Sequence, residues 1–177
     1  MTKQLYISII ICFINFSKLH SQNTDVKINN EYQRIENLKT LRIDSLSLIR
    51  GIDFNQGSNV DEKIYKIYKE KKRIVKIEYQ EIHKGYRKWD KKTTIYLKNN
   101  IPYFITENTN GVMTLYTNEG EKSKPYKEKE EIYVYDWDNE KIKRVYNGHE
   151  ATPQMKLCKV CYGELIEKIK LEFKSKP

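Results

Sequence analysis

The sequence is poor in glycine, cysteine and alanine. Its 177 residues include 7 glycines, 4 prolines and 3 cysteines, and alanine occurs once, at Ala151. Catalytic signatures are also missing: there is no Gly-x-Ser-x-Gly, no His-Glu-x-x-His and no glycine-rich phosphate loop. Carboxylates are plentiful, but their spacing selects no pair for acid-base catalysis. These absences argue against the common hydrolase and nucleotide-binding classes, and we expect no cofactor and no metal.

The positive charge of the chain is weak evidence for any partner. Lys and Arg number 33 against 24 Asp and Glu, which gives a formal net charge of +9. Lysine, isoleucine, asparagine, tyrosine and glutamate are abundant while alanine is scarce, a bias typical of an A+T-rich genome. We therefore expect no nucleic-acid partner. A polyanion-binding protein that uses basic loops at residues 69–73 and 87–92 stays as an alternative.

The apolar run near the N-terminus, residues 7–16, is shorter than the roughly 20 residues that a transmembrane helix needs. It follows Lys3, and a more polar segment ends at Ser21. This arrangement is typical of a signal peptide. We predict that residues 1–21 are removed, that the mature chain has no transmembrane span, and that it is periplasmic or secreted. A buried N-terminal strand or helix is the alternative. Cys12 lies in the middle of the apolar run. It lacks the small residue that precedes a lipid-attachment cysteine, so we do not expect a lipid anchor there.

Three strand-turn-strand units fill the centre of the chain, and each opens on Ile-Tyr, at Ile64, Ile95 and Ile132. In the first unit Val75 and Ile77 alternate with charged residues, and this period of two predicts a sheet with one apolar face. Tyrosine takes the other face in the last unit. The turns are rich in Asn, Asp and Lys, as in short hairpins. We predict hairpin repeats over residues 63–146, with residues 83–92 and 118–125 as longer connections and residues 112–116 as a candidate further strand.

Apolar residues at helical spacing flank the repeats. On the N-terminal side, after a cap at Asp25 or Asn29, they recur at steps of three and four: Ile28, Tyr32, Ile35, Leu38 and Leu41. On the C-terminal side, residues 157–174 are predicted to contain a closing helix that covers the apolar face of the sheet. The expected fold over residues 22–177 is a single α+β domain. Its sheet is a curved antiparallel β-meander of about six or seven strands, with an N-terminal and a C-terminal helix.

The motif Cys158-Lys-Val-Cys161 predicts a disulfide. Cys12 would leave with the signal peptide, so the exported chain would hold two cysteines in an oxidising compartment. A bridge over so short a loop contributes about 2 kcal/mol. Thiol-disulfide chemistry through Cys158 and Cys161 is an alternative, although the motif precedes a closing helix rather than a thioredoxin-like domain. A zinc half-site is another, but zinc needs two more ligands and His83 and His149 are isolated.

A charged aromatic segment is the candidate partner contact. Trp89 is surrounded by Arg87, Lys91 and Lys92, and we interpret it as an exposed aromatic residue in a basic loop. Tryptophan and arginine are enriched in contact surfaces. The alternative is that Trp89 covers an edge of the core.

Residues 136–140 are similar to the start of a calcium loop. The loop would need glycine where Lys141 stands and glutamate where Asn147 stands. Asp and Asn are also favoured in tight turns. We therefore predict a hairpin turn at this position.

Residues 65–77, 94–105 and 132–145 resemble the repeated hairpins of a broad group of uncharacterised secreted or periplasmic proteins from Bacteroidetes-type bacteria. The likeness covers about half of the chain. The chain departs from the group in lacking glycine in these three turns and in its Cys158/Cys161 tail. The resemblance implies a fold and an exported location, and it carries no catalytic residues. The leading hypothesis is a non-enzymatic binding or cell-envelope interaction module whose partner is a protein or a glycan.

Overall fold

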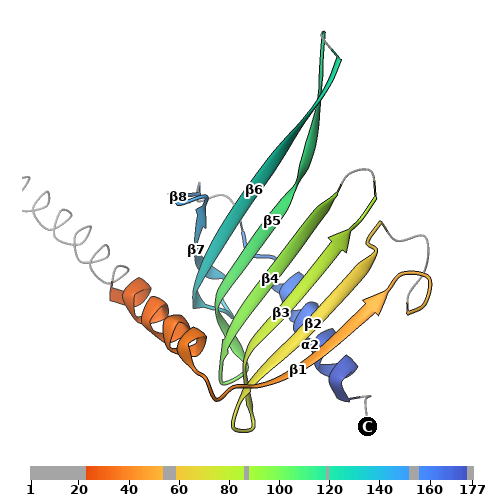
Figure 1. Cartoon of the computed structure of the whole chain (residues 1–177). Helices are drawn as coiled ribbons and strands as arrows, with labels where there is room; N and C mark the ends of the chain where they lie inside the picture. Colours follow the sequence, from red (N-terminus) through yellow and green to blue (C-terminus); the bar gives the residue numbers. More distant parts are fainter. Residues whose placement is uncertain (1–22, 54–58, 86–87, 119, 152–155, 175–177) are drawn as a thin grey trace, which may run out of the picture. The chain divides into compact units, whose positions relative to one another are not determined.

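The computed structural model describes residues 23–53, 59–85, 88–118, 120–151 and 156–174 (Figure 1). The predicted signal peptide lies outside these residues. The chain divides into two compact units, residues 1–37 and 38–177. In the first unit, residues 23–37 form helix α1. The predicted caps at Asp25 and Asn29 are wrong, because the helix is already formed at residue 23. Leu38 and Leu41 lie beyond its end.

The second unit is an antiparallel sheet of eight strands in which each strand pairs with its neighbours in sequence (Figure 1). The elements are β1 (Arg42–Ile49), β2 (Glu62–Glu70), β3 (Arg73–His83), β4 (Trp89–Lys98), β5 (Ile101–Thr117), β6 (Gly120–Asp136), β7 (Lys141–Tyr146), β8 (His149–Glu150) and α2 (Lys159–Lys174). The predicted antiparallel meander is confirmed, but the strand count is higher than the expected six or seven. The sheet continues into β8 because Asn147 and Gly148 take positive φ angles of 48° and 85° and form a tight turn.

The three predicted hairpins are present, and their turns form without glycine. Asn99 and Asn100 have φ angles of 53° and 66°, which is the backbone of a type I′ turn. In the β6–β7 turn, Asp136 Oδ1 accepts hydrogen bonds from the backbone nitrogens of Asp138 (3.0 Å) and Asn139 (3.1 Å). A hydrogen bond from the Asn139 side chain lowers the pKa of Asp136. This carboxylate therefore stabilises a hairpin turn.

Helix α2 packs against one face of the sheet, which we call the helix face (Figure 1). The centre of that face is a row of isoleucines, one from each of five neighbouring strands and each under 2% exposed: Ile67, Ile77, Ile95, Ile105 and Ile132. Ile166 and Ile169 of α2 belong to the same core, so the prediction that the closing helix covers the apolar face is confirmed. The other face carries aromatic rings, with Phe104 between Tyr96 (5.6 Å) and Tyr133 (5.0 Å).

Strands β5 and β6 are 17 residues long and extend past their neighbours. The pairing of β4 with β5 ends at Gly111, and the pairing of β7 with β6 begins at Glu130. Beyond these points the two strands project as a ribbon (Figure 1), which we call the arm: residues 112–117 and 120–127. The predicted connection at residues 118–125 is therefore wrong, because β6 is already formed at Gly120. The candidate strand at residues 112–116 is the end of β5.

Candidate functional site

Between the isoleucine row and the arm, the helix face carries three further rows of side chains. Residues two apart along a strand lie on the same face, so the register of β3 to β6 defines the rows. They are Tyr79, Thr93, Glu107 and Glu130; then Glu81, Lys91, Thr109 and Glu128; then His83, Trp89, Gly111 and Tyr126. We call the last set the aromatic row. It lies roughly 20 Å from the isoleucine row.

Gly111 allows the aromatic row to form. A Cβ placed on Gly111 would lie 2.6 Å from Cε1 and 2.9 Å from Cζ of Tyr126. The Tyr126 ring therefore lies against the backbone of β5, where any other residue would put a side chain. Aromatic rings therefore lie on both sides of Gly111, with His83 and Trp89 on one side and Tyr126 on the other.

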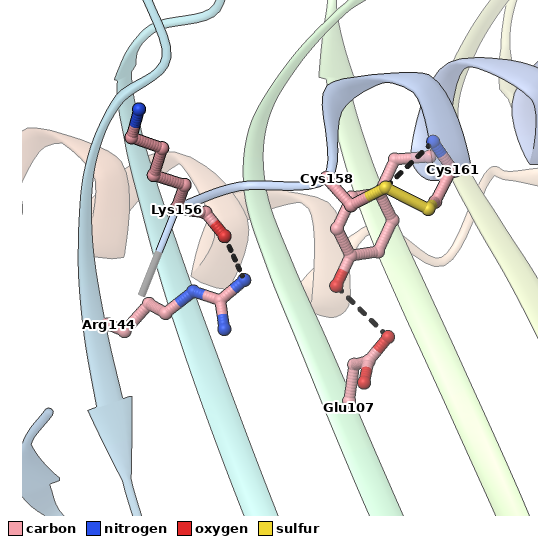
Figure 2. Close-up of a disulfide and its surroundings, with 6 residues drawn as sticks. Glu107, Arg144, Lys156, Cys158 and Cys161 are labelled. Carbon is pink, nitrogen blue, oxygen red and sulfur yellow. Dashed lines mark hydrogen bonds between the residues drawn. A yellow bond between two sulfur atoms is a disulfide. The ribbon is translucent and has the colours of Figure 1, made fainter. Parts of the chain in front are cut away.

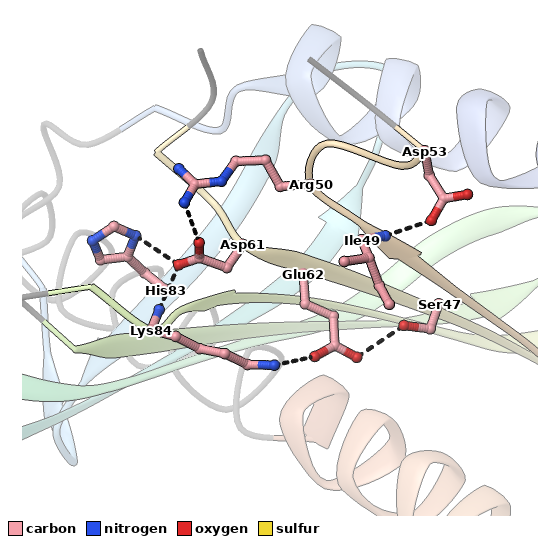
Figure 3. A network of polar contacts seen from close by, with 8 residues as sticks. All are labelled: Ser47, Ile49, Arg50, Asp53, Asp61, Glu62, His83 and Lys84. Atoms are coloured by element: carbon pink, nitrogen blue, oxygen red, sulfur yellow. Dashed lines mark hydrogen bonds and ion pairs between the residues drawn. The ribbon is translucent and has the colours of Figure 1, made fainter. Parts of the chain in front are cut away.

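His83 and Trp89 are held together at the other end of the row. Their rings stack with centroids 5.9 Å apart. Figure 3 shows that His83 Nδ1 also faces Asp61, at 3.4 Å from Oδ2, although the geometry is not that of a hydrogen bond. The Asp61 carboxylate accepts a hydrogen bond from the backbone nitrogen of Lys84 (2.6 Å) and contacts Arg50 (2.5 Å). The Lys84 bond and the nearby positive charges lower the pKa of Asp61, so an ionised carboxylate lies beside the His83 ring.

Two grooves lie beside the aromatic row where β4 begins. The first measures about 730 Å³ and is lined by Asn59, His83, Trp89, Val112, Met113, Thr114, Tyr126 and Glu128. The second measures about 490 Å³ and is lined by Ile82, His83, Lys84, Lys88, Trp89, Asp90, Asn110, Gly111 and Val112. Ile82, Asp90 and Asn110 belong to the face opposite the helix face, by alternation along their strands. His83, Trp89 and Val112 line both grooves and therefore lie between them.

The predicted contact residues do not form one basic loop. Arg87 lies outside the described residues. Trp89 is the first residue of β4 and is partly buried, so its assignment to a loop is wrong. Lys91 lies on the helix face, 2.7 Å from Glu107, and Lys92 lies on the other face, 3.0 Å from Glu78. Consecutive residues of a strand point to opposite faces, and each lysine is neutralised there by a carboxylate.

Cys158 and Cys161 form a disulfide at the start of α2, with their Cα atoms 5.3 Å apart (Figure 2). Cys158 acts as the N-cap of the helix: its Sγ accepts a hydrogen bond from the backbone nitrogen of Cys161 (3.3 Å), and its carbonyl accepts one from Tyr162 (3.2 Å). N-cap residues satisfy backbone donors that the first turn leaves open. The bridge therefore fixes the first turn of α2.

A cavity of about 340 Å³ lies next to the disulfide, between the start of α2 and the sheet. Four of its charged side chains form ion pairs, Lys91 with Glu107 and Arg144 with Glu130. The Tyr162 hydroxyl donates to Glu107 (3.0 Å), which also binds Lys91, and Arg144 contacts both Glu130 (3.0 Å) and the carbonyl of Lys156 (3.1 Å) (Figure 2). Burial, together with the Glu107 charge, raises the pKa of Tyr162 far above its ordinary value. This network joins the start of α2 to β5, β6 and β7.

Metal-binding clusters and membrane-spanning helices are both lacking in the part of the chain that the structure describes. No group of three or more His, Cys, Asp and Glu side chains there could hold a metal ion. None of the described helices is long and apolar enough to cross a membrane. A scan of protein-family models gave no match to the chain, and searches of the curated proteins and of the solved structures gave none either. The aromatic row and the grooves beside it form the candidate functional site.

Proposed function

We propose that the mature chain, residues 22–177, is an exported, non-enzymatic binding module that meets a partner in the cell envelope, and that the aromatic row is its contact surface. The observation that carries this proposal is the alignment of His83, Trp89 and Tyr126 across four strands, beside a groove of about 730 Å³. Half-buried aromatic rings next to a few polar groups are typical of recognition surfaces. The signal-peptide pattern and the disulfide support export.

The polyanion alternative has less support, because three lysines of the two predicted basic stretches are paired with carboxylates. Lys69 lies 2.6 Å from Asp44, and Lys91 and Lys92 contact Glu107 and Glu78. A lysine already paired with a carboxylate has less charge to offer a phosphate or sulfate. The thiol-disulfide alternative also has less support, because the bridge serves as the cap of α2 and lies beside a network of paired charges.

The proposal is tested with Trp89 as its own reporter. The chain has 2 tryptophans, so a Trp137→Phe variant leaves Trp89 as the fluorophore. This variant is screened against polysaccharides, lipid vesicles, nucleotides, heparin and displayed peptides. One ligand class is expected to shift the Trp89 emission and to raise the midpoint of thermal unfolding by mass action.

The control compares the two tryptophans. Trp89→Ala in the parent chain is expected to lower the affinity for that ligand by at least about tenfold, as for an aromatic hot spot. Trp137→Phe should bind like the parent, since Trp137 packs against the core. A ligand whose affinity is unchanged in Trp89→Ala would place the contact surface elsewhere on the chain.

A further inference from the structure

The two edges of the arm differ in character. On the β5 side, residues 112–117 contain no charged residue, and four large apolar side chains there are between 40% and 73% exposed: Val112, Met113, Leu115 and Tyr116. On the β6 side the arm carries Lys122, Lys124, Pro125 and Lys127. Lysine and proline on an edge strand oppose pairing with another strand. The β5 edge has no such protection.

The backbone of the β5 edge is set up to accept a strand. The Val112 nitrogen donates to the carbonyl of Lys88 at 3.1 Å, where β4 begins. In an antiparallel ladder, alternate residues direct both backbone groups to the same side, and the β5–β6 register is unbroken here. Thr114 and Tyr116 therefore direct their N–H and C=O groups to the side of Val112. Past Val112, no strand in the described ranges pairs with that side.

The two grooves border the start of the free edge, at Val112, where the first side chains of an added strand would point. One opens on the helix face beside Met113, and the other includes Asp90 and Asn110 of the opposite face. Successive side chains of a strand alternate between the two faces. In strand addition the backbone bonds supply affinity, and pockets for alternate side chains supply specificity. Trp89, which lines both grooves, would contact side chains on either face.

Two lysines supply positive charge at this edge. Lys88 and Lys124 are exposed, and among the described residues neither forms an ion pair. The nearby carboxylates of Asp90 and Glu128 keep their negative charge, because the groups that donate to them, the Asn110 amide (3.3 Å) and the Tyr146 hydroxyl, are neutral. The whole chain carries +9. An acidic partner is attracted to such a surface, and a second copy of this basic chain is repelled.

We propose that the free edge of β5 binds an extended acidic segment of a partner protein, which adds as a strand beside Thr114 and Tyr116 and places alternate apolar side chains in the two grooves. This inference rests on the proposed function, because Trp89 of the aromatic row lines both grooves. It goes further in naming a protein strand as the partner and the β5 backbone as its main contact.

The test begins with a displayed library of random 12-residue peptides, selected on immobilised residues 22–177. Enriched peptides are expected to have apolar residues at alternate positions with Asp or Glu among them. A synthetic copy of the most enriched peptide is then measured by fluorescence against two variants. Thr114→Pro removes an outward N–H on the β5 edge, and Ser123→Pro makes the same change at the paired position on the β6 edge. Pro125 already occupies an outward-facing β6 position, opposite Val112.

Thr114→Pro is expected to lower the peptide affinity by about tenfold or more, and Ser123→Pro to change it by less than about twofold. Circular dichroism and thermal unfolding check that both variants fold. A second measurement uses the parent chain and two methylated forms of the peptide. One form carries N-methyl groups on the odd-numbered backbone nitrogens and the other on the even-numbered ones. Only the form whose methyl groups replace the N–H groups that face β5 should lose affinity.

Several outcomes would overturn the inference. They are failure to enrich any peptide, equal losses in Thr114→Pro and Ser123→Pro, and equal tolerance of both methylated forms. Suppose that a glycan binds, that Trp89→Ala weakens its binding and that Thr114→Pro does not. The proposed function would then hold, and the proposal of an added peptide strand would be wrong. Binding that survives both Trp89→Ala and Thr114→Pro would remove both proposals. Self-association through the arm would show instead as a dimer in sedimentation.

Discussion

The ring of Tyr126 lies over Gly111, its partner across β5 and β6, and a Cβ on Gly111 would sit 2.6 Å from Tyr126 Cε1. Gly111→Ala is therefore expected to displace the ring from the groove. The free energy of unfolding should change by less than about 1 kcal/mol, because alanine suits a strand better than glycine and the ring is the movable end of a side chain. Ligand binding at the aromatic row should weaken. Urea denaturation and a binding titration measure the two effects.

Gly163→Ala is the matched control for this change. Gly163 lies in α2, and a Cβ there meets nothing within 4 Å. Alanine is favoured over glycine inside a helix by about 1 kcal/mol, so this variant should be more stable and should bind normally. A Gly111→Ala variant that binds as tightly as the parent would show that the Tyr126 ring is not part of the contact surface.

Glu78 gives a pH-dependent prediction. It receives hydrogen bonds from Lys76 (3.0 Å), Lys92 (3.0 Å) and the Tyr68 hydroxyl (2.8 Å). Burial raises its pKa, but these bonds outweigh burial and hold the pKa of Glu78 below its ordinary value of 4.5. Glu78→Gln leaves the buried Lys76 without its carboxylate and should cost about 3 kcal/mol at neutral pH.

The sign of the pH dependence follows from the lowered pKa. The stabilisation by Glu78 is present above pH 4.5 and is lost as the pH falls through the pKa of the folded state. Urea denaturation near neutral pH and in acid should therefore show a smaller difference between the parent and Glu78→Gln in acid. Glu167→Gln is the control, since this exposed residue pairs with Lys170 on the surface of α2. An equal difference at both pH values would assign the effect to packing.

Reduction of Cys158–Cys161 is expected to lower the free energy of unfolding by about 2 kcal/mol, as for a bridge across a short loop. Denaturation with and without reductant measures the change. The Cys158→Ser/Cys161→Ser double variant is the control and should not respond to reductant. Insulin reduction by the parent should not exceed that of Cys158→Ser. Activity that disappears in Cys158→Ser would favour thiol-disulfide chemistry over a structural bridge.

Heparin should retain the mature chain only weakly in spite of its positive charge. Lys69, Lys91 and Lys92 each contact a carboxylate, at 2.6, 2.7 and 3.0 Å. We therefore expect elution at low salt and a shallow dependence of the affinity on salt. Asp44→Asn, which frees Lys69 from its partner, should increase retention. A steep salt dependence of the parent chain would show that the paired lysines are available to a polyanion.

Local patterns predict the hairpins because one face of those strands is lined by aliphatic side chains and the other by polar and aromatic ones. Ile77 and Ile95 lie in the isoleucine row, and their polar neighbours in sequence produce the period of two. The arm shows no such period in β6, where Lys122 and Lys124 share the helix face of the strand with Tyr126, because both sides of a two-stranded ribbon are wet. The start of β4 was missed for a related reason: Lys91 and Lys92 meet carboxylates on opposite faces.

The aromatic row could not be read from any local pattern. Trp89 and Tyr126 come from separate hairpins, and their alignment depends on the register of β4, β5 and β6. Trp89 stands out in the sequence for its charged surroundings, whereas Gly111 and Tyr126, which lie in the same row, belong to no motif. Neither Gly111 in β5 nor Tyr126 in a charged strand is unusual by itself. Their contact can be recognised only when the register that pairs β5 with β6 is known.

The difference between the two edges of the arm also limits how many molecules can join there. A strand added to β5 would leave the far side of the arm, with Lys122, Lys124, Pro125 and Lys127, still closed to pairing. An open-ended fibre of this chain through the arm would need a pairing edge on both sides of each arm, and the arm offers one. Copies of the protein therefore cannot stack arm upon arm without limit.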